Sequence, residues 1–382
     1  MNQQEITLAN WRLPPQNVWA FKNVDRLIPT RPIKAGTPRP LPRGTALDLG
    51  ALSFPFQNKS LTVAQALSDS YTDGFLVLHQ GAIVAERYTD CDAATRHILF
   101  SVSKSVTGTL AGILVGQGSL DPDAPVTKYV PEVAGSAYGD CTVRHVLDMT
   151  VSVNFVEDYL DTTGDFARYR SATGWNPARA EFGGEALHGF IASLKRGSAP
   201  HGERFHYVSP NSDLLGWIVE RAGAAPFNEL LSRLIWQPMG AEADALITID
   251  AKGAVRSAGG ICSTLRDLAR FGELMRLGGA AGDKQIVPAA WIDDILSNGD
   301  RAAWAKGSMA PLFPKGSYRS KWYMTNEPSG AFCAIGIHGQ WIYVDPSAAM
   351  VAVKQSSQPL PEDGNFDQLT LALMRRIAEE VN

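Results

Sequence analysis

Phe100-Ser101-Val102-Ser103-Lys104-Ser105 lies between a short apolar segment and a run with helical spacing. In that run apolar residues recur at intervals of three and four, which predicts a helix starting near Ser101. Lys104 would then share one helical face with Ser101. Backbone N–H groups in a first helical turn lack partners within the helix, so they can bind an oxyanion. The spacing therefore indicates a serine nucleophile beside a lysine, although it also fits a helix-capping serine and a solvated lysine.

The composition is that of an ordinary globular protein. The chain has 382 residues, enough for one or two domains, and a formal charge of −4 without any basic tract. We therefore expect neither nucleic acid nor a membrane as partner. Residues 1–5 lack the basic and apolar regions of a secretion signal, and Cys91, Cys141, Cys262 and Cys333 form no CxxC motif. These features predict a cytoplasmic protein with buried free thiols.

Strand patterns occur near the two ends of the chain, and helical patterns fill its middle. Apolar runs at 75–78 and 82–85 flank a His-Gln-Gly turn, and runs at 340–344 and 350–353 flank an Asp-Pro turn. Both pairs predict β-hairpins. Helical spacing is found in segments along the rest of the chain: 60–70, 214–222, 227–235, 265–275 and 366–381.

We therefore predict an α/β protein of the α+β kind, with an antiparallel sheet flanked by helices. Residues 1–100 and 246–382 would form the sheet domain, and residues 101–245 would form a mostly helical domain inserted into it. The prolines of residues 1–45 predict an extended arm, anchored by three aromatic side chains: Trp11, Trp19 and Phe21. Ser101 would lie at the seam between the two domains, where ligand sites often form.

A serine nucleophile needs a base, and a lysine of ordinary pKa is a poor base near neutral pH. A tyrosine could take that role if a neighbouring ammonium lowered its pKa. Tyr207 is the main candidate, because it stands between the strand-like segment 204–206 and the helical segment 214–222. The alternative is a tyrosine that serves only in packing.

A glycine-rich stretch, Gly336-Ile337-His338-Gly339-Gln340, leads into the terminal hairpin. Gly336 would let a ligand approach the backbone, and the N–H of Ile337 would join that of Ser101 as an oxyanion donor. His338 is expected to be a structural hydrogen-bonding residue, and a simple strand-end bend is the alternative for the whole stretch. The sequence contains no zinc, calcium, phosphate-loop, dinucleotide or GxSxG motif, so we expect no metal and no cofactor.

These motifs, in this order, resemble those of the serine β-lactamase and penicillin-recognising superfamily, and most closely its class C and esterase branch. Ser101-Val102-Ser103-Lys104 matches the first motif, and Tyr207-Val208-Ser209 stands where the branch carries Tyr-x-Asn. The whole chain is still more similar to the 6-aminohexanoate-dimer hydrolases. This similarity includes the segments 17–21, 146–149, 157–159, 213–221 and 336–340.

The resemblance implies a β-lactamase-like fold and a role for each matching residue. Ser101 would be the nucleophile, Lys104 its activating partner and Tyr207 the general acid and base. Tyr159 would donate a proton to the leaving nitrogen. The segment 336–339 would line the substrate site and supply the oxyanion N–H of Ile337.

Two departures bear on the substrate. Ser209 replaces the asparagine of the second motif and Lys-Thr-Gly is missing, which argues against efficient penicillin turnover. Ungapped matching puts Arg170 where the dimer hydrolases hold the substrate's amino group with an acidic residue, although Asp161 and Asp165 are close. If Arg170 lies in the pocket, it should favour a carboxylate or neutral tail over an ammonium.

The leading hypothesis is a serine hydrolase that cleaves carboxylic esters or small linear amides through an acyl-enzyme. Tyr159, Arg170, Ser209, His338 and Gly336 are the expected substrate-binding residues. A β-lactamase or D-amino-acid peptidase of the same fold is one alternative, and a catalytically silent binding protein is another. The expected partner is a small-molecule ester or amide, and a homodimer stays open as the assembly.

Overall fold

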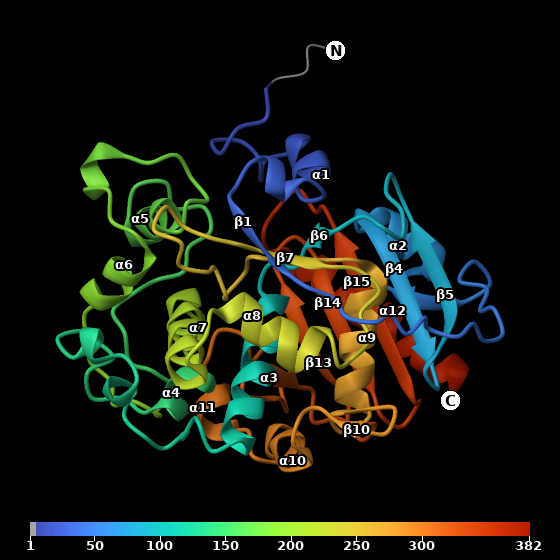
Figure 1. The fold of residues 1–382 in the computed structure, drawn as a ribbon. Coiled ribbons are helices and arrows are strands. Elements are labelled where there is room, and N and C mark those ends of the chain that lie inside the picture. The colour runs from blue at the N-terminus through green and yellow to red at the C-terminus, as the bar shows by residue number, and fades with distance from the viewer. Residues whose placement is uncertain (1–4) are drawn as a thin grey trace.

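The central element is a seven-stranded antiparallel sheet, seen in a computed structural model that describes residues 5–382 (Figure 1). Its strands, in spatial order, are β11 (Ser317–Arg319), β12 (Trp322–Met324), β13 (Phe332–Gly336), β14 (Gln340–Asp345), β15 (Met350–Ser356), β4 (Thr72–His79) and β5 (Ala82–Tyr88). Strand β15 pairs with β4 through the register Val353↔Leu76. Strands from residues 72–88 and from residues 317–356 therefore meet in one sheet.

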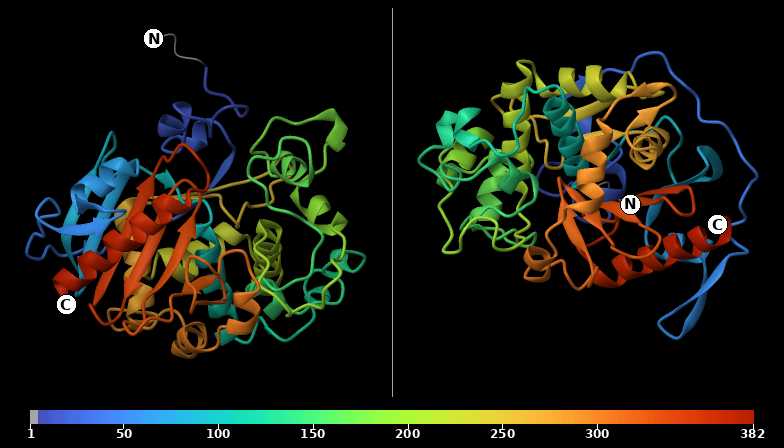
Figure 2. Two further views of the ribbon diagram at one scale, coloured as in Figure 1. Left: turned by 180° about the vertical axis from the view of Figure 1, so that it is seen from behind. Right: turned by 90° about the horizontal axis from the view of Figure 1, so that it is seen from below.

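Helices cover both faces of this sheet. Helix α9 (Leu265–Arg276) packs on β14, β15 and β4, whereas α12 (Gly364–Val381) lies across the opposite face with α2 (Val63–Asp69) (Figure 2). Side chains alternate along a strand. Trp341 and Tyr343 accordingly join the apolar cluster of α12, and Ile342 joins that of α9. Because both faces of β14 are covered by helices, all six of its residues are buried.

A second, four-stranded sheet carries the chain to the start of the third helix. It contains β1 (Thr30–Ile33), β7 (Ala245–Thr248), β8 (Ile261–Ser263) and β6 (His97–Ile98) in that order. Two further strand pairs are β2 (Ser53–Phe56) with β3 (Lys59–Thr62), and β9 (Ala280–Ala281) with β10 (Lys284–Gln285). Strand β6 leads within three residues into α3 (Val102–Gly116), so the second sheet determines where Ser101 lies.

The remaining helices in the middle of the chain are α4 (Val143–Leu147), α5 (Asp165–Ala172), α6 (Leu187–Ser193), α7 (Ser209–Gly223) and α8 (Phe227–Leu231). Among them, α7 packs on α3, while α4 and α6 pack on α7. The others are α1 (Gln16–Ala20), α10 (Ala289–Ser297) and α11 (Arg301–Ala305). Within residues 5–382, none of these helices has both the length and the apolar character needed to cross a bilayer.

The predicted class and both predicted hairpins are confirmed, whereas some local predictions are wrong. Residues 204–206 form no strand, because Phe205 packs into a cluster of aromatic rings rather than onto a sheet edge. The arm over 1–45 contains helix α1 and strand β1 and is therefore less extended than predicted. Trp11 and Phe21 are buried anchors, but Trp19 remains 38% exposed. All four cysteines are free, and Cys91 is only partly buried.

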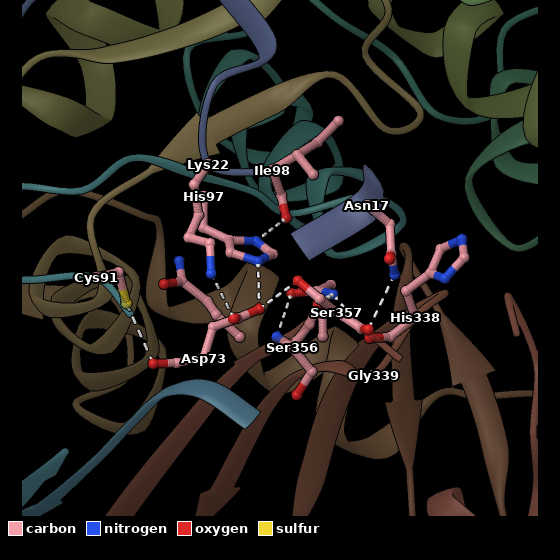
Figure 3. A network of polar contacts seen from close by, with 12 residues as sticks. Asn17, Lys22, Asp73, Cys91, His97, Ile98, His338, Gly339, Ser356 and Ser357 are labelled. Carbon is pink, nitrogen blue, oxygen red and sulfur yellow. Dashed lines mark hydrogen bonds and ion pairs between the residues drawn. The ribbon is translucent and has the colours of Figure 1, made fainter. Parts of the chain in front are cut away.

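A network of polar side chains ties the N-terminal arm to the main sheet (Figure 3). Asp73 of β4 accepts hydrogen bonds from Lys22 (2.7 Å) and Ser357 (2.5 Å), and contacts His97 Nε2 at 3.2 Å. The bonds from His97 and Lys22 outweigh the effect of burial and lower the pKa of Asp73. Asn17 Nδ2 donates to the carbonyl of Ser357 at 2.9 Å. The arm is therefore fixed to the end of β15.

Gly108 tests how closely α3 must approach the turn before β12. A Cβ added at Gly108 would overlap the backbone carbonyl oxygen of Ser320. Gly108→Ala should therefore lower the free energy of unfolding by about 1–3 kcal/mol. This loss is expected even though alanine has a higher intrinsic helix propensity than glycine. The matched control is Gly364→Ala in α12, where nothing lies within 4 Å. Urea denaturation of both variants measures the difference, and equal stabilities would contradict the close packing.

Candidate active site

Ser101 lies at the junction between β6 and α3. Phe100, directly before it, has a φ of 43°, a strained value for a bulky residue, and such strain tends to occur at functional sites. Ser101 is 8% exposed and is the residue preceding α3. Its Oγ accepts a hydrogen bond from Lys104 Nζ at 2.7 Å. The predicted pairing on one helical face is therefore present, and the lysine is not solvated.

Lys104 is buried, and its pKa is far below the usual value for a lysine. Its Nζ also donates to the carbonyl of Ala258 at 2.9 Å and lies 4.9 Å from the centre of the Tyr207 ring. Burial lowers the pKa of Lys104 to about 7, and the positive charge of Arg256 adds to this effect, while Glu157 opposes it. A large share of the molecules therefore hold a neutral amine at neutral pH, and this amine can accept a proton.

Tyr207 lies in the loop that enters α7, and its ionisation differs from the sequence prediction. Burial and the negative charge of Glu157 raise the pKa of Tyr207 well above its usual value, although a hydrogen bond with Ser101 opposes them. The prediction that a neighbouring ammonium lowers this pKa is wrong, because burial and the charge of Glu157 raise it. Tyr207 is therefore a phenol that can donate and relay protons.

Gly336 ends β13 directly against the serine backbone. A Cβ at this position would lie 2.7 Å from the carbonyl oxygen of Leu99 and 3.0 Å from the nitrogen of Ser101. Only glycine permits this approach, which brings the next residue, Ile337, into the same cavity as Ser101. His338 is buried, its Nδ1 lies 2.7 Å from the carbonyl of Gln358, and burial lowers its pKa to about 4. His338 is thus a neutral side chain held by a backbone carbonyl.

Glu157 is a site residue to which the sequence assigned no role. Its carboxylate accepts from Ser209 Oγ at 2.6 Å and from Tyr159 Oη at 2.7 Å. It also accepts from the backbone N–H of Ser209, at the N-terminus of α7, where negative charge is favoured. Ser209 and Tyr159 are therefore both held by one carboxylate.

A buried ion pair helps to position Lys104 through the backbone of Ala258. Asp213 of α7 pairs with Arg256 and accepts from the hydroxyl of Tyr169. The same carboxylate accepts from the N–H of Ala258 at 2.8 Å. Because the carbonyl of Ala258 holds Lys104, Asp213 positions one of the two acceptors of the lysine. No sequence signal pointed to this pair, whose members lie 43 residues apart.

One cavity of about 510 Å³ brings most of the predicted residues together. Its lining includes Ser101, Lys104, Tyr159, Arg170, Ser209, Ile337 and His338, and also Arg12, Glu157, Trp175 and Arg256. Tyr207 and Gly336 are not part of the lining but lie against Lys104 and the Ser101 backbone. A groove of about 590 Å³ beside α1 shares no lining residue with this cavity.

In this site a serine at the start of a helix is hydrogen-bonded to a buried lysine, and the helix packs against an antiparallel sheet. This arrangement is typical of serine hydrolases that form an acyl-enzyme. Comparison with known proteins agrees with this class. The chain belongs to the β-lactamase family, whose model matches residues 63–373. The β-lactamase-like fold predicted from the motifs is thereby confirmed.

The chain is similar along its whole length to proteins described as 6-aminohexanoate-dimer hydrolases. The 6-aminohexanoate-dimer hydrolase of Paenarthrobacter ureafaciens is 37% identical over 379 residues, which is 99% of this chain and 95% of that protein. A candidate 6-aminohexanoate-dimer hydrolase from Bacillus anthracis has a TM-score of 0.90 at 25% identity, covering 100% of this chain and 98% of that one. The protein is thus a serine hydrolase of the amidase and esterase kind.

The fold alone is shared more widely. EstCE1, a hydrolase with promiscuous acyltransferase activity, has a TM-score of 0.64 at 16% identity and covers 82% of this chain and 96% of its own. The similarity to the P. ureafaciens hydrolase spans the N-terminal arm as well, because it includes 99% of this chain. The arm is therefore part of what this chain shares with that relative.

Asp213 provides a test of the support behind Lys104. Its side chain is fully buried with Arg256, so Asp213→Ala leaves an uncompensated charge in the interior. We expect the free energy of unfolding to fall by about 3–5 kcal/mol. The control is Glu132→Ala, which removes the exposed partner of Arg221 and should cost about 0–1 kcal/mol. Thermal or urea denaturation compares the two, and similar losses would exclude a structural role for this ion pair.

Proposed function

We propose that this enzyme hydrolyses carboxylic esters or small linear amides, with Ser101 as the nucleophile. The observation that carries the proposal is the 2.7 Å hydrogen bond between the Ser101 hydroxyl and a lysine amine whose pKa is about 7. A general base works best when its pKa is near the working pH, because a large share of it is then unprotonated while it is still basic enough to accept a proton. Lys104 is therefore the base that accepts the proton of Ser101.

Acylation forms one bond and breaks another. The Ser101 oxygen attacks the carbonyl carbon while its proton passes to Lys104. The N–H groups of Ser101 and Ile337 hold the resulting oxyanion, which is stabilised because these donors are already in place. The intermediate then collapses, and the alcohol or amine leaves with a proton supplied by Lys104 through Tyr207.

Deacylation repeats these steps with water. Tyr207 and Lys104 take a proton from the water that attacks the acyl-enzyme, and the proton returns to Ser101 as the carboxylic acid leaves. The raised pKa of Tyr207 suits this role, because the phenol passes a proton on without standing as a phenolate. Tyr159 would turn its hydroxyl from Glu157 to the leaving nitrogen of an amide, which leaves less readily than an alkoxide.

The rim of the cavity suits substrates with apolar chains. Leu13, Leu160 and Leu360 line it while remaining 57%, 73% and 51% exposed. Together with the similarity to an aminohexanoate-dimer hydrolase, this rim favours linear acyl or amide chains over compact β-lactams. The unpaired cysteines suit a reducing compartment, so we place the enzyme in the cytoplasm. A homodimer is the assembly to test by analytical ultracentrifugation.

Covalent labelling tests the nucleophile. A fluorophosphonate should add once to the protein, on the peptide that contains Ser101, and Ser101→Ala should lose the label together with hydrolysis of nitrophenyl butyrate by several orders of magnitude. Ser105→Ala is the matched control, since Ser105 donates to the carbonyl of Lys321 rather than facing Lys104. Peptide mass spectrometry locates the adduct. Labelling of Ser103, Ser105 or Ser209 would disprove the assignment, and faster turnover of a chromogenic cephalosporin would favour a β-lactamase.

The pH dependence tests the base. Below pH 7 Lys104 is mostly protonated and cannot accept a proton, so kcat/KM for nitrophenyl butyrate should rise with pH through one ionisation near 7. Glu157→Gln removes a negative charge that raises the pKa of Lys104, and should shift this rise to lower pH. Lys104→Arg keeps the charge at every pH and should be nearly inactive. A profile that is flat through neutrality, or that Glu157→Gln shifts upward, would contradict this mechanism.

A further inference from the structure

We propose that the substrate of Ser101 carries a carboxylate at the end of an apolar chain, and that this carboxylate binds between Arg12 and Arg170. The inference rests on the proposed hydrolase function and adds the chemical class of the substrate. Both arginines line the cavity that contains the Ser101 hydroxyl. They come from distant parts of the chain, Arg12 from the N-terminal arm and Arg170 from α5.

Both guanidinium groups are only partly exposed, yet neither pairs with a carboxylate among residues 5–382. Arg12 donates to the side-chain oxygen of Asn176 and lies 5.2 Å from the centre of the Trp11 ring. Arg170 donates only to backbone carbonyls, those of Tyr159 and Asp161. Within the part of the chain that the structure describes, its Nε is buried without a hydrogen-bond partner. Both groups therefore have capacity for an anion.

Three other charged residues of the cavity, Arg179, Arg256 and Glu157, already have polar partners. Arg256 pairs with Asp213, and Arg179 lies 3.5 Å from Glu181. The carboxylate of Glu157 is bonded to Ser209 and Tyr159. The carboxylate of a substrate would thus meet two arginines that form no ion pair with an acid among residues 5–382, although the charges of Asp161 and Asp158 lie close enough to Arg170 to oppose the lowering of its pKa by burial.

Electrostatics and rigidity both support this site. Burial lowers the pKa of Arg12 to about 9, with further lowering by the positive charges of Arg170 and Arg256. An anion between Arg12 and Arg170 would relieve that repulsion. The arm holds Arg12 in place, because Trp11 Nε1 donates to the carbonyl of Trp175 at 2.9 Å and the bonds of Asn17 and Lys22 fix the following turn (Figure 3). Two preorganised guanidinium groups bind a carboxylate well.

Matched substrates test the proposal. The first pair is the nitrophenyl monoester of adipic acid and nitrophenyl hexanoate, which differ in a terminal carboxylate on the acyl chain. The second pair is carboxyphenyl butyrate and phenyl butyrate, which differ in a carboxylate on the leaving group. The quantity measured is the ratio of kcat/KM within each pair, because it cancels general damage to catalysis.

We expect Arg12→Gln and Arg170→Gln each to lower this ratio about tenfold to a hundredfold in at least one pair. Arg12→Lys keeps the charge but loses the two-pronged geometry, and should give an intermediate ratio. The control is Arg26→Gln, an arm residue that lies over the Trp19 ring outside this cavity, and it should leave both ratios unchanged. Melting temperatures exclude variants that fail to fold.

The outcomes separate this inference from the proposed function. Unchanged ratios in both pairs, with hydrolysis still lost in Ser101→Ala, would overturn the carboxylate site and leave the hydrolase intact. If the wild-type protein cleaves no member of either pair, the hydrolase proposal fails, and calorimetric titration with adipate tests the anion site alone. Adipate binding that weakens tenfold or more in Arg12→Gln and Arg170→Gln supports the site. Equal binding by the wild type and both variants overturns it.

Discussion

The withdrawal of one lysine amine from water is the constraint on which the rest of the site depends. An ordinary lysine is a cation at neutral pH and would only hold the serine hydroxyl, whereas a desolvated amine can accept its proton. The surroundings of Lys104 keep that balance. Burial favours the neutral amine, and the negative charges of Glu157 and Asp213 keep its pKa from falling far below neutrality. Hydrogen bonds to Ser101 Oγ and to the Ala258 carbonyl then fix the position of the amine beside the serine hydroxyl.

Close packing around α3 keeps this arrangement rigid. Gly108, within α3, allows the helix to pack against the carbonyl of Ser320. At the N-terminus of α3, Gly336 allows β13 to pack against the backbone of Ser101. The buried ion pair between Asp213 and Arg256 also fixes the segment of Ala258, because Asp213 accepts a hydrogen bond from the Ala258 N–H. Polar groups in an interior of low dielectric constant interact strongly but must all be satisfied. The site is therefore a set of satisfied polar groups surrounding one amine and one hydroxyl.

The N-terminal arm completes the cavity from outside the main fold. Its attachment through Lys22 and Asn17 to Asp73 and Ser357 joins it to the sheet that also carries Gly336. The arm thereby adds Trp11 and Arg12 to a pocket whose nucleophile belongs to α3. In a family defined by a shared fold, substrate choice can change through such an added wall without any change in the serine, lysine and tyrosine.

The sequence by itself determined the class and the two hairpins, and it predicted the helix start that places Ser101 beside Lys104, because these depend on local periodicity and on short motifs. It did not reveal Glu157, Arg256 or Arg12 as parts of the site, since each reaches the cavity through contacts between segments far apart in the chain. The sign of the Tyr207 pKa shift was wrong for the same reason. Burial is a property of the folded molecule, and only the tertiary structure shows that Lys104 and Tyr207 lie in a desolvated interior where both tend to be neutral.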